Sequence, residues 1–201
     1  MNLFVLDSDP IAAAKFCYDV HCVKMPLEGM QMLCTNTRLL LGEEATQHEM
    51  MSTQLMRATH ANHPSTIWGR TSSHNFAWML ANTEALFREY TRRYGKTHAS
   101  EQRLYALMPL FEQCMEKLES WGNIEQTPFA LAMPDACKLA CPVASYRKLY
   151  AHKAQQEIDK VVVYNVLVRR GCSPRKPALR FVWNKATRPE WATFKTADCL
   201  L

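Results

Sequence analysis

The sequence contains only six glycines in 201 residues and no long apolar run. The glycines form neither the glycine-rich loop that cradles nucleotide phosphates nor the G-x-S-x-G elbow of serine hydrolases, so both hydrolase classes are disfavoured. No apolar stretch approaches the roughly 20 residues of a membrane-spanning helix. The first residues also lack the charged-then-apolar pattern of a secretory signal. We therefore expect a soluble, cytoplasmic protein with no membrane partner.

Metal-binding spacings are also missing, although the chain has eight cysteines and seven histidines. Four residues separate Cys17 from Cys22 and three separate Cys137 from Cys141, whereas two separate the paired ligands of many structural zinc sites. No two histidines are spaced like those of a helical zinc motif. We expect free thiols rather than disulfides, no metal and no cofactor.

Positive charge is concentrated in the last quarter of the chain, whose formal net charge as a whole is +5. Residues 145–201 hold 12 Lys and Arg against 4 Asp and Glu, whereas residues 1–144 hold 12 against 15. The phosphate backbone of DNA would favour such a basic segment. A solvated basic tail has the same composition, so both interpretations stay open.

Apolar residues recur with helical periodicity through most of the chain. Hydrophobic residues make up 48% of the sequence. This pattern predicts a mainly α fold, a compact single-domain helical bundle over residues 1–170. A basic C-terminal segment, residues 171–201, would pack on the bundle or trail from it as an extension. The predicted helices are residues 11–23, 26–41, 72–94, 100–121 with a kink at Pro109, and 144–170.

Three polar residues of the second predicted helix share one stripe, because Lys24, Glu28 and Gln31 are spaced four and three apart. A partly buried Glu28 could act as a general acid or base, or stabilise a developing cation. A glutamate in the first turn of a helix also interacts favourably with the helix dipole, which is a second explanation for Glu28 at this position. Lys24 and Gln31 beside it favour a site.

Two imidazoles are further candidates for this site. His21 lies one turn before Lys24, and His63 belongs to an Asn62-His63-Pro64 turn. Such a turn can simply cap nearby backbone groups. We nevertheless include His21 and His63 among the catalytic candidates.

A cluster of cations is predicted where the 72–94 helix ends, in the segment RRYGKTH, residues 92–98. These cations could complement the helix dipole or bind phosphate, with Tyr94 or Trp68 offering a surface on which a base stacks. The residues that we predict to contact nucleic acid are Asn62, Trp68, Arg70, Asn75, Arg93, Lys96, His98 and Arg147.

Several segments carry a resemblance to known proteins that runs through most of residues 1–150. They are MNLFVLD (residues 1–7), DVHCVKM (19–25), QML (31–33), NHPSTIW (62–68), EYTRRYGK (89–96) and AMPD (132–135). Together they resemble an uncharacterised family that is common in tailed bacteriophages. The resemblance implies that the protein acts in the cytoplasm of an infected bacterial host.

A more distant resemblance implies a chemistry. The order Asp19, Lys24, Glu28, Gln31, Asn62-His63-Pro64, Trp68, Glu89 and Arg92-Arg93 is similar to pyrimidine-dimer DNA glycosylase-like proteins. Their relative, the phage endonuclease that excises ultraviolet-damaged pyrimidine dimers, is a compact helical enzyme. By this resemblance the nucleophile is the α-amine of Met1, or of Asn2 if Met1 is removed. Glu28 is then the acid/base.

Our leading hypothesis is a phage DNA-acting protein, a glycosylase/lyase-like enzyme that acts on the N-glycosidic bond of a modified or damaged base, with duplex DNA as its expected partner. One alternative is a non-catalytic counter-defence factor that binds nucleic acid or a host protein, for which exposed Trp183 and Trp191 would matter most. A second alternative is group transfer onto a DNA base or nucleotide. The sequence leaves the oligomeric state open.

Overall fold

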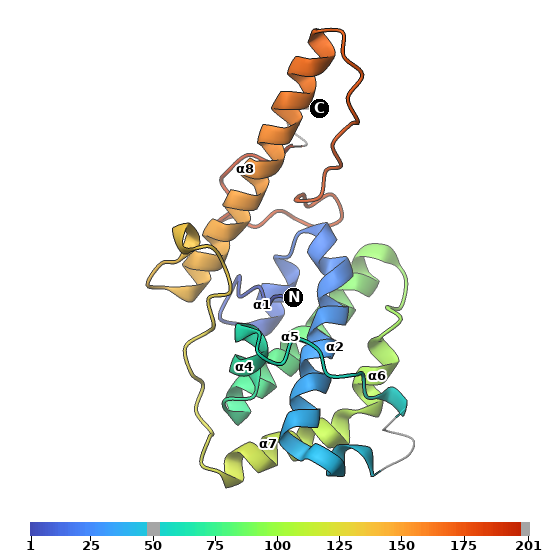
Figure 1. Cartoon of the computed structure of the whole chain (residues 1–201), viewed down its shortest axis with the longest axis vertical. Helices are drawn as coiled ribbons and strands as arrows, with labels where there is room; N and C mark the ends of the chain where they lie inside the picture. Colours follow the sequence, from blue (N-terminus) through green and yellow to red (C-terminus); the bar gives the residue numbers. More distant parts are fainter. Residues whose placement is uncertain (48–52, 198–201) are drawn as a thin grey trace.

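The computed structural model describes residues 1–47 and 53–197, and in these ranges the fold is all-helical, without a β-strand (Figure 1). This confirms the prediction of a mainly α fold. The α-helices are α1 (Pro10–Lys15), α2 (Asp19–Leu41), α4 (Pro64–Gly69), α5 (Ser73–Tyr94), α6 (Glu101–Ala106), α7 (Met108–Ser120) and α8 (Pro142–Arg169). Two 3-10 helices, η1 (Gly42–Thr46) and η2 (Asp135–Cys137), accompany them. None of the helices in the described ranges combines the length and apolarity needed to cross a bilayer.

Helix α5 is central to the core and packs against α1, α2, α4, α6 and α7. Its predicted bounds are close to those observed, because both ends carry strong local signals. The Ser72 hydroxyl accepts a hydrogen bond from the Asn75 N–H at 3.2 Å, and Gly95 ends the helix with a left-handed φ of 63°. Phe76 and Phe87, one on each half of the helix, are fully buried in the core.

The break between α1 and α2 differs from our prediction. We expected a helix over residues 11–23 and a new start at Pro26, but α1 ends at Lys15 and α2 runs through Pro26. The carbonyl oxygens of Lys15 and Cys17, at the break, each accept a hydrogen bond of 2.8 Å from the guanidinium of Arg93. Side-chain donors far along the chain therefore satisfy backbone groups that a continuous helix would have paired internally.

The predicted kink at Pro109 is a complete break, because α6 ends at Ala106 and α7 begins at Met108. Proline is well accommodated there, since the first turn of a helix does not use its backbone N–H for hydrogen bonding. The loop after α7 then runs along the body of the molecule to the base of α8 (Figure 1).

Helix α8 projects from the body, and the chain after it turns back beside it (Figure 1). Residues near the end of the described chain reach the start of α2. The indole N–H of Trp183 donates to the Phe16 carbonyl at 3.0 Å, and its ring lies 4.3 Å from that of Tyr18. The expectation that Trp183 is exposed is therefore wrong, since only 8% of it is exposed. Trp191 is partly buried.

Candidate functional site

A polar cluster forms where the start of the chain meets α2. The α-amino nitrogen of Met1 lies 3.6 Å from Oε2 of Glu28, and the backbone N–H of Asn2 donates to the same oxygen at 2.9 Å. Nζ of Lys24, one helical turn before Glu28, lies 3.2 Å from its other oxygen. Three of the residues that the sequence singled out as catalytic candidates, Met1, Asn2 and Lys24, therefore converge on the carboxylate of a fourth, Glu28.

The apolar chain start fixes the α-amine in this position. Leu3, Phe4, Val5 and Leu6 are buried in the core, so the two residues before them are held at its edge. The amide of Asn2 donates to the Ala132 carbonyl at 3.1 Å. The hydroxyl of Tyr146 donates to the Ala130 carbonyl at 2.7 Å and lies 3.4 Å from the Asn2 amide oxygen. Sequence analysis missed Tyr146, because no local pattern links it to residue 2.

His63 belongs to the same neighbourhood through α4, which packs on α2. As the N-cap of α4 it accepts the Ser65 N–H on Nδ1 at 3.2 Å, so the neutral ring carries its proton on Nε2. Burial lowers the pKa of His63, the positive α-amine lowers it further, and Glu28 partly opposes both. The imidazole is therefore within electrostatic reach of the amine and the carboxylate. The next residues of α4 also contact the chain start, since the Thr66 hydroxyl lies 3.7 Å from the Met1 sulfur.

His21 has a different environment from the other catalytic candidates. It is buried, with its ring stacked on Phe4 at 4.2 Å and Nδ1 lying 2.6 Å from the Tyr150 hydroxyl. Burial lowers its pKa well below the ordinary value, and the positive charges of Lys153 and Lys24 add to this effect. His21 is thus neutral, and its contacts are with the aromatic residues Phe4 and Tyr150.

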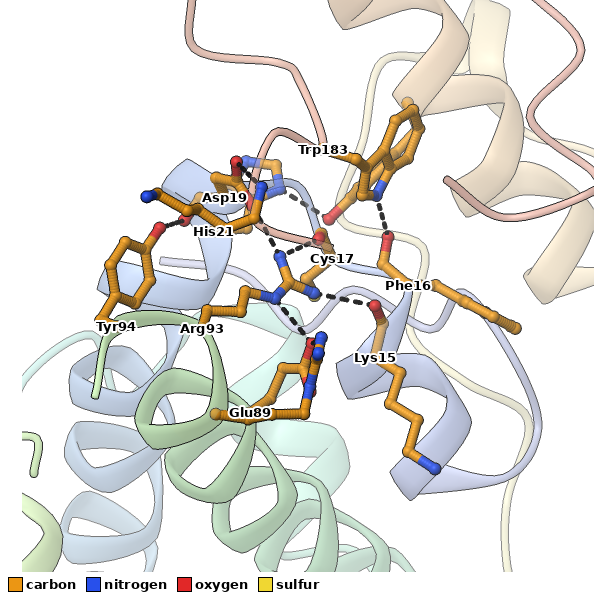
Figure 2. A network of polar contacts seen from close by, with 12 residues as sticks. Lys15, Phe16, Cys17, Asp19, His21, Glu89, Arg93, Tyr94 and Trp183 are labelled. Atoms are coloured by element: carbon orange, nitrogen blue, oxygen red, sulfur yellow. Dashed lines mark hydrogen bonds and ion pairs between the residues drawn. The ribbon is translucent and has the colours of Figure 1, made fainter. Parts of the chain in front are cut away.

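Arg93, predicted to bind phosphate, is buried within a network of polar contacts (Figure 2). Its guanidinium donates to Glu89 at 2.6 Å and to Asp19 at 3.0 Å, in addition to the Lys15 and Cys17 carbonyls. Burial by itself would raise the pKa of Glu89, but hydrogen bonds from Arg92 and Arg93 outweigh burial and lower it. The donors of Arg93 are thus engaged inside the protein, where they join α5 to the end of α1 and the start of α2.

Other residues predicted to contact nucleic acid are also engaged internally. Trp68 is 4% exposed and donates its indole N–H to the Thr127 carbonyl at 3.2 Å. Asn75 is fully buried and donates to Trp68 O at 2.9 Å and to the Thr127 hydroxyl at 2.7 Å. Arg70 donates to the Ala61 carbonyl at 2.8 Å, which supports the turn that presents His63. These three residues shape the surroundings of the cluster.

The remaining predicted contacts vary in exposure. Asn62 and Lys96 are exposed, and His98 accepts the Ser100 N–H at 3.2 Å. Arg147 donates to the Leu6 carbonyl at 2.9 Å and to Asp7 at 3.2 Å, just after the buried chain start. Among these four residues, Asn62 is the neighbour of His63 in the sequence.

The cluster combines an amine, a carboxylate and a neutral imidazole, which are groups suited to nucleophilic attack and proton transfer. Among the described residues, no three His, Cys, Asp or Glu side chains converge in the way that ligands of a metal ion would. No protein-family model matches the sequence, and no curated protein or solved structure is significantly similar to it.

Proposed function

We propose that this chain is a phage DNA-acting enzyme of the glycosylase/lyase type, which acts on the N-glycosidic bond of a modified or damaged base. The observation that carries the proposal is the distance of 3.6 Å between the Met1 α-amine and the Glu28 carboxylate. Amines that form covalent intermediates with sugars need a neighbouring group that removes their proton, and Glu28 is placed for that role. The His63 imidazole, whose pKa responds to the charges of both groups, supports the same chemistry.

The proposed reaction begins when the α-amine, which is positive at rest beside Glu28, loses a proton to solvent and attacks C1′ of the nucleotide. The bond between C1′ and the base breaks, and the base leaves with the electron pair and takes a proton from water. Glu28 accepts the second proton that the amine loses, and its negative charge stabilises the cationic sugar in the transition state. Glu28 then gives this proton to the ring oxygen O4′ as the sugar ring opens to a protonated imine. Water hydrolyses the imine, or loss of a proton from C2′ expels the 3′ phosphate.

Exposed groups around the cluster suit a polyanionic substrate. The side chain of Lys24 is 51% exposed although it is close to Glu28, so it can contact a DNA phosphate while keeping its carboxylate partner. Asn62 is exposed next to His63. We place the damaged nucleotide between these two residues, with duplex DNA as its source. The base in question would have to leave the stack to reach the amine.

Borohydride trapping tests the proposal, because borohydride reduces an imine to a stable covalent bond. The purified protein is mixed with abasic, ultraviolet-irradiated and phage-derived DNA, and adducts are separated on a denaturing gel. We expect an adduct with at least one substrate. Peptide mapping of the adduct identifies the amine and shows whether the chain begins at Met1 or at Asn2.

The variant Glu28→Gln tests the role of the carboxylate in trapping. Glu119→Gln, on the exposed face of α7, is its control. We expect Glu28→Gln to lower the rate of adduct formation by about a hundredfold or more, the range typical of a lost general base, while DNA binding persists. An unchanged rate would remove Glu28 from the mechanism. Binding without any adduct would instead favour the non-catalytic counter-defence factor, or a transferase that requires a small co-substrate.

A further inference from the structure

A separate cavity of about 640 Å³ lies between α1, α5, α8 and the loop of residues 186–191. Its walls include four cationic side chains and two aromatic rings: Lys15, Arg92, Arg147, Arg188, Phe16 and Trp191. Its volume falls within the range of small-molecule sites, which is roughly 300–1,000 Å³. None of these lining residues belongs to the cluster around Glu28.

The cavity carries an excess of positive charge, because Glu190 is the carboxylate that lines it beside the four cations. Two of the cations already have acidic partners: Arg92 pairs with Glu89 at 2.6 Å and Arg147 with Asp7 at 3.2 Å. These pairs hold the two guanidinium groups in place. They also leave most of the excess charge on the remaining two cations.

Lys15 and Arg188 have no carboxylate within ion-pair distance in the described part of the chain. Arg188 is nevertheless well fixed, since its Nε donates to the Ala192 carbonyl at 2.7 Å and its guanidinium lies 5.6 Å from the rings of Trp183 and Phe194. The terminal nitrogens of a fixed guanidinium suit two oxygens of one phosphate. Lys15 is exposed at the end of α1 and adds a second positive charge.

The aromatic part of the cavity has its own unmet hydrogen bond. The rings of Phe16 and Trp191 meet edge to face at 6.0 Å, and the guanidinium of Arg147 lies 5.0 Å from the Trp191 ring. The indole N–H of Trp191 is buried and has no acceptor among the described residues. A buried donor without an acceptor is costly, so a shift of the Trp191 ring that gives this N–H an acceptor would be favourable.

We propose that this cavity binds an organic phosphate of nucleotide size, with the phosphate at Lys15 and Arg188 and a planar ring at Trp191. The cations supply the attraction for the anion, and the aromatic walls favour a flat, polar ring over a bare inorganic ion. A free mononucleotide and the nucleotide unit of a DNA strand share this chemistry. The site is independent of the amine chemistry proposed at Glu28.

Titration calorimetry of the full chain tests the site with four probes: a deoxynucleoside 5′-monophosphate, the matching nucleoside, inorganic phosphate and a 5′-phosphorylated oligonucleotide. Each of the four natural bases is tested separately. We expect at least one monophosphate to bind ten times more tightly than its nucleoside or than inorganic phosphate. The oligonucleotide distinguishes the sources, since displacement of the monophosphate by it indicates a strand and lack of displacement indicates a free nucleotide.

The central variant is Lys15→Gln, with Lys148→Gln on an exposed part of α8 as the matched loss of one positive charge. Lys15→Gln should weaken monophosphate binding about tenfold, whereas Lys148→Gln should leave it unchanged. Arg188→Gln should weaken it further, and the melting temperature of each variant shows whether it is folded. The proposal is overturned if no monophosphate binds at millimolar concentration, if inorganic phosphate binds equally well, or if the two lysine variants behave alike.

Discussion

The backbone N–H of Asn2 donates to Oε2 of Glu28 at 2.9 Å, across 26 residues of sequence. This contact fixes the carboxylate from the side of the chain start, while Lys24 holds its other oxygen from within α2 at 3.2 Å. Glu28 is thus oriented by two independent elements. The position of the α-amine relative to Glu28 depends on the same short segment.

The first prediction concerns that position. One glycine added before Met1 moves the α-amine by about one residue, roughly 3.8 Å, and turns the original nitrogen into an amide. We expect trapping by borohydride to fall at least tenfold, with the melting temperature nearly unchanged because Leu3–Leu6 still fill the core. Circular dichroism and the trapping gel measure the two effects. Equal trapping by the extended chain would show that another amine, such as that of Lys24, is the nucleophile.

The second prediction concerns the close approach of α2 and α5 beside the candidate site. A Cβ placed on Gly29 would overlap Oγ1 and Cγ2 of Thr83, whose hydroxyl donates to the Met79 carbonyl at 2.8 Å. We expect Gly29→Ala to lower the free energy of unfolding by about 1–3 kcal/mol, as overpacking does.

A double-mutant cycle tests the cause. Combining Gly29→Ala with Thr83→Ala removes the overlapping atoms, so the pair should lose less stability than the two single changes added together. Strict additivity in urea denaturation would mean that the helices do not approach as closely as the structure shows.

The third prediction compares two ion pairs on α5. Arg93 is buried and bonded to Glu89 at 2.6 Å, whereas Arg88 is exposed and pairs with Glu84 four residues before it. Arg93→Met leaves Glu89 buried with only Arg92 as a partner and frees the Lys15 and Cys17 carbonyls, so we expect a loss of about 3–5 kcal/mol. Arg88→Met should cost less than about 1 kcal/mol. Chemical denaturation of both variants checks the comparison, and equal losses would contradict the burial of the network in Figure 2.

The fourth prediction is a pH dependence of stability. Burial holds the pKa of His21 well below its ordinary value of 6.5, so the folded state keeps this ring neutral while the unfolded state protonates it. The unfolded state therefore binds more protons below pH 6.5, and stability falls as the pH drops from 7 to 5. His21 alone would account for up to about 2 kcal/mol of that loss.

Replacing His21 by leucine removes this titration and isolates it from the other histidines. The variant should be less stable at pH 7, because Tyr150 loses a partner at 2.6 Å. Its stability should nevertheless depend less on pH than that of the original chain. An identical slope between pH 7 and pH 5 would show that His21 is protonated in the folded state.

Local sequence signals predicted α5 and the end of α8 well, because caps and left-handed glycines mark them at the residues themselves. Gly171, for example, lies just beyond the end of α8 and has a left-handed φ of 79°. The break after α1 was not predictable in this way. It depends on the guanidinium of Arg93, which is 76 residues beyond the Cys17 carbonyl that it binds.

The candidate site was predictable in its components and less so in its surroundings. Helical spacing placed Lys24 and Glu28 together, whereas the α-amine was expected only from a proposed resemblance to DNA glycosylase-like proteins. Trp68 and Asn75 had the residue types of nucleic-acid contacts, yet both are buried, since only the tertiary fold reveals that the Thr127 loop covers them. Polar residue type alone does not distinguish an internal hydrogen bond from a contact with a ligand.

The hydrogen bonds of Asn2 with Ala132 and Tyr146 also bear on the timing of folding during synthesis. Asn2, once synthesised, must wait for partners that lie up to 144 positions later in the chain. At the usual rates of translation that interval lasts roughly 7 to 30 s. The segment around Asn2 therefore stays unassembled until α8 emerges, and the candidate site would form only after most of the helical body is already in place.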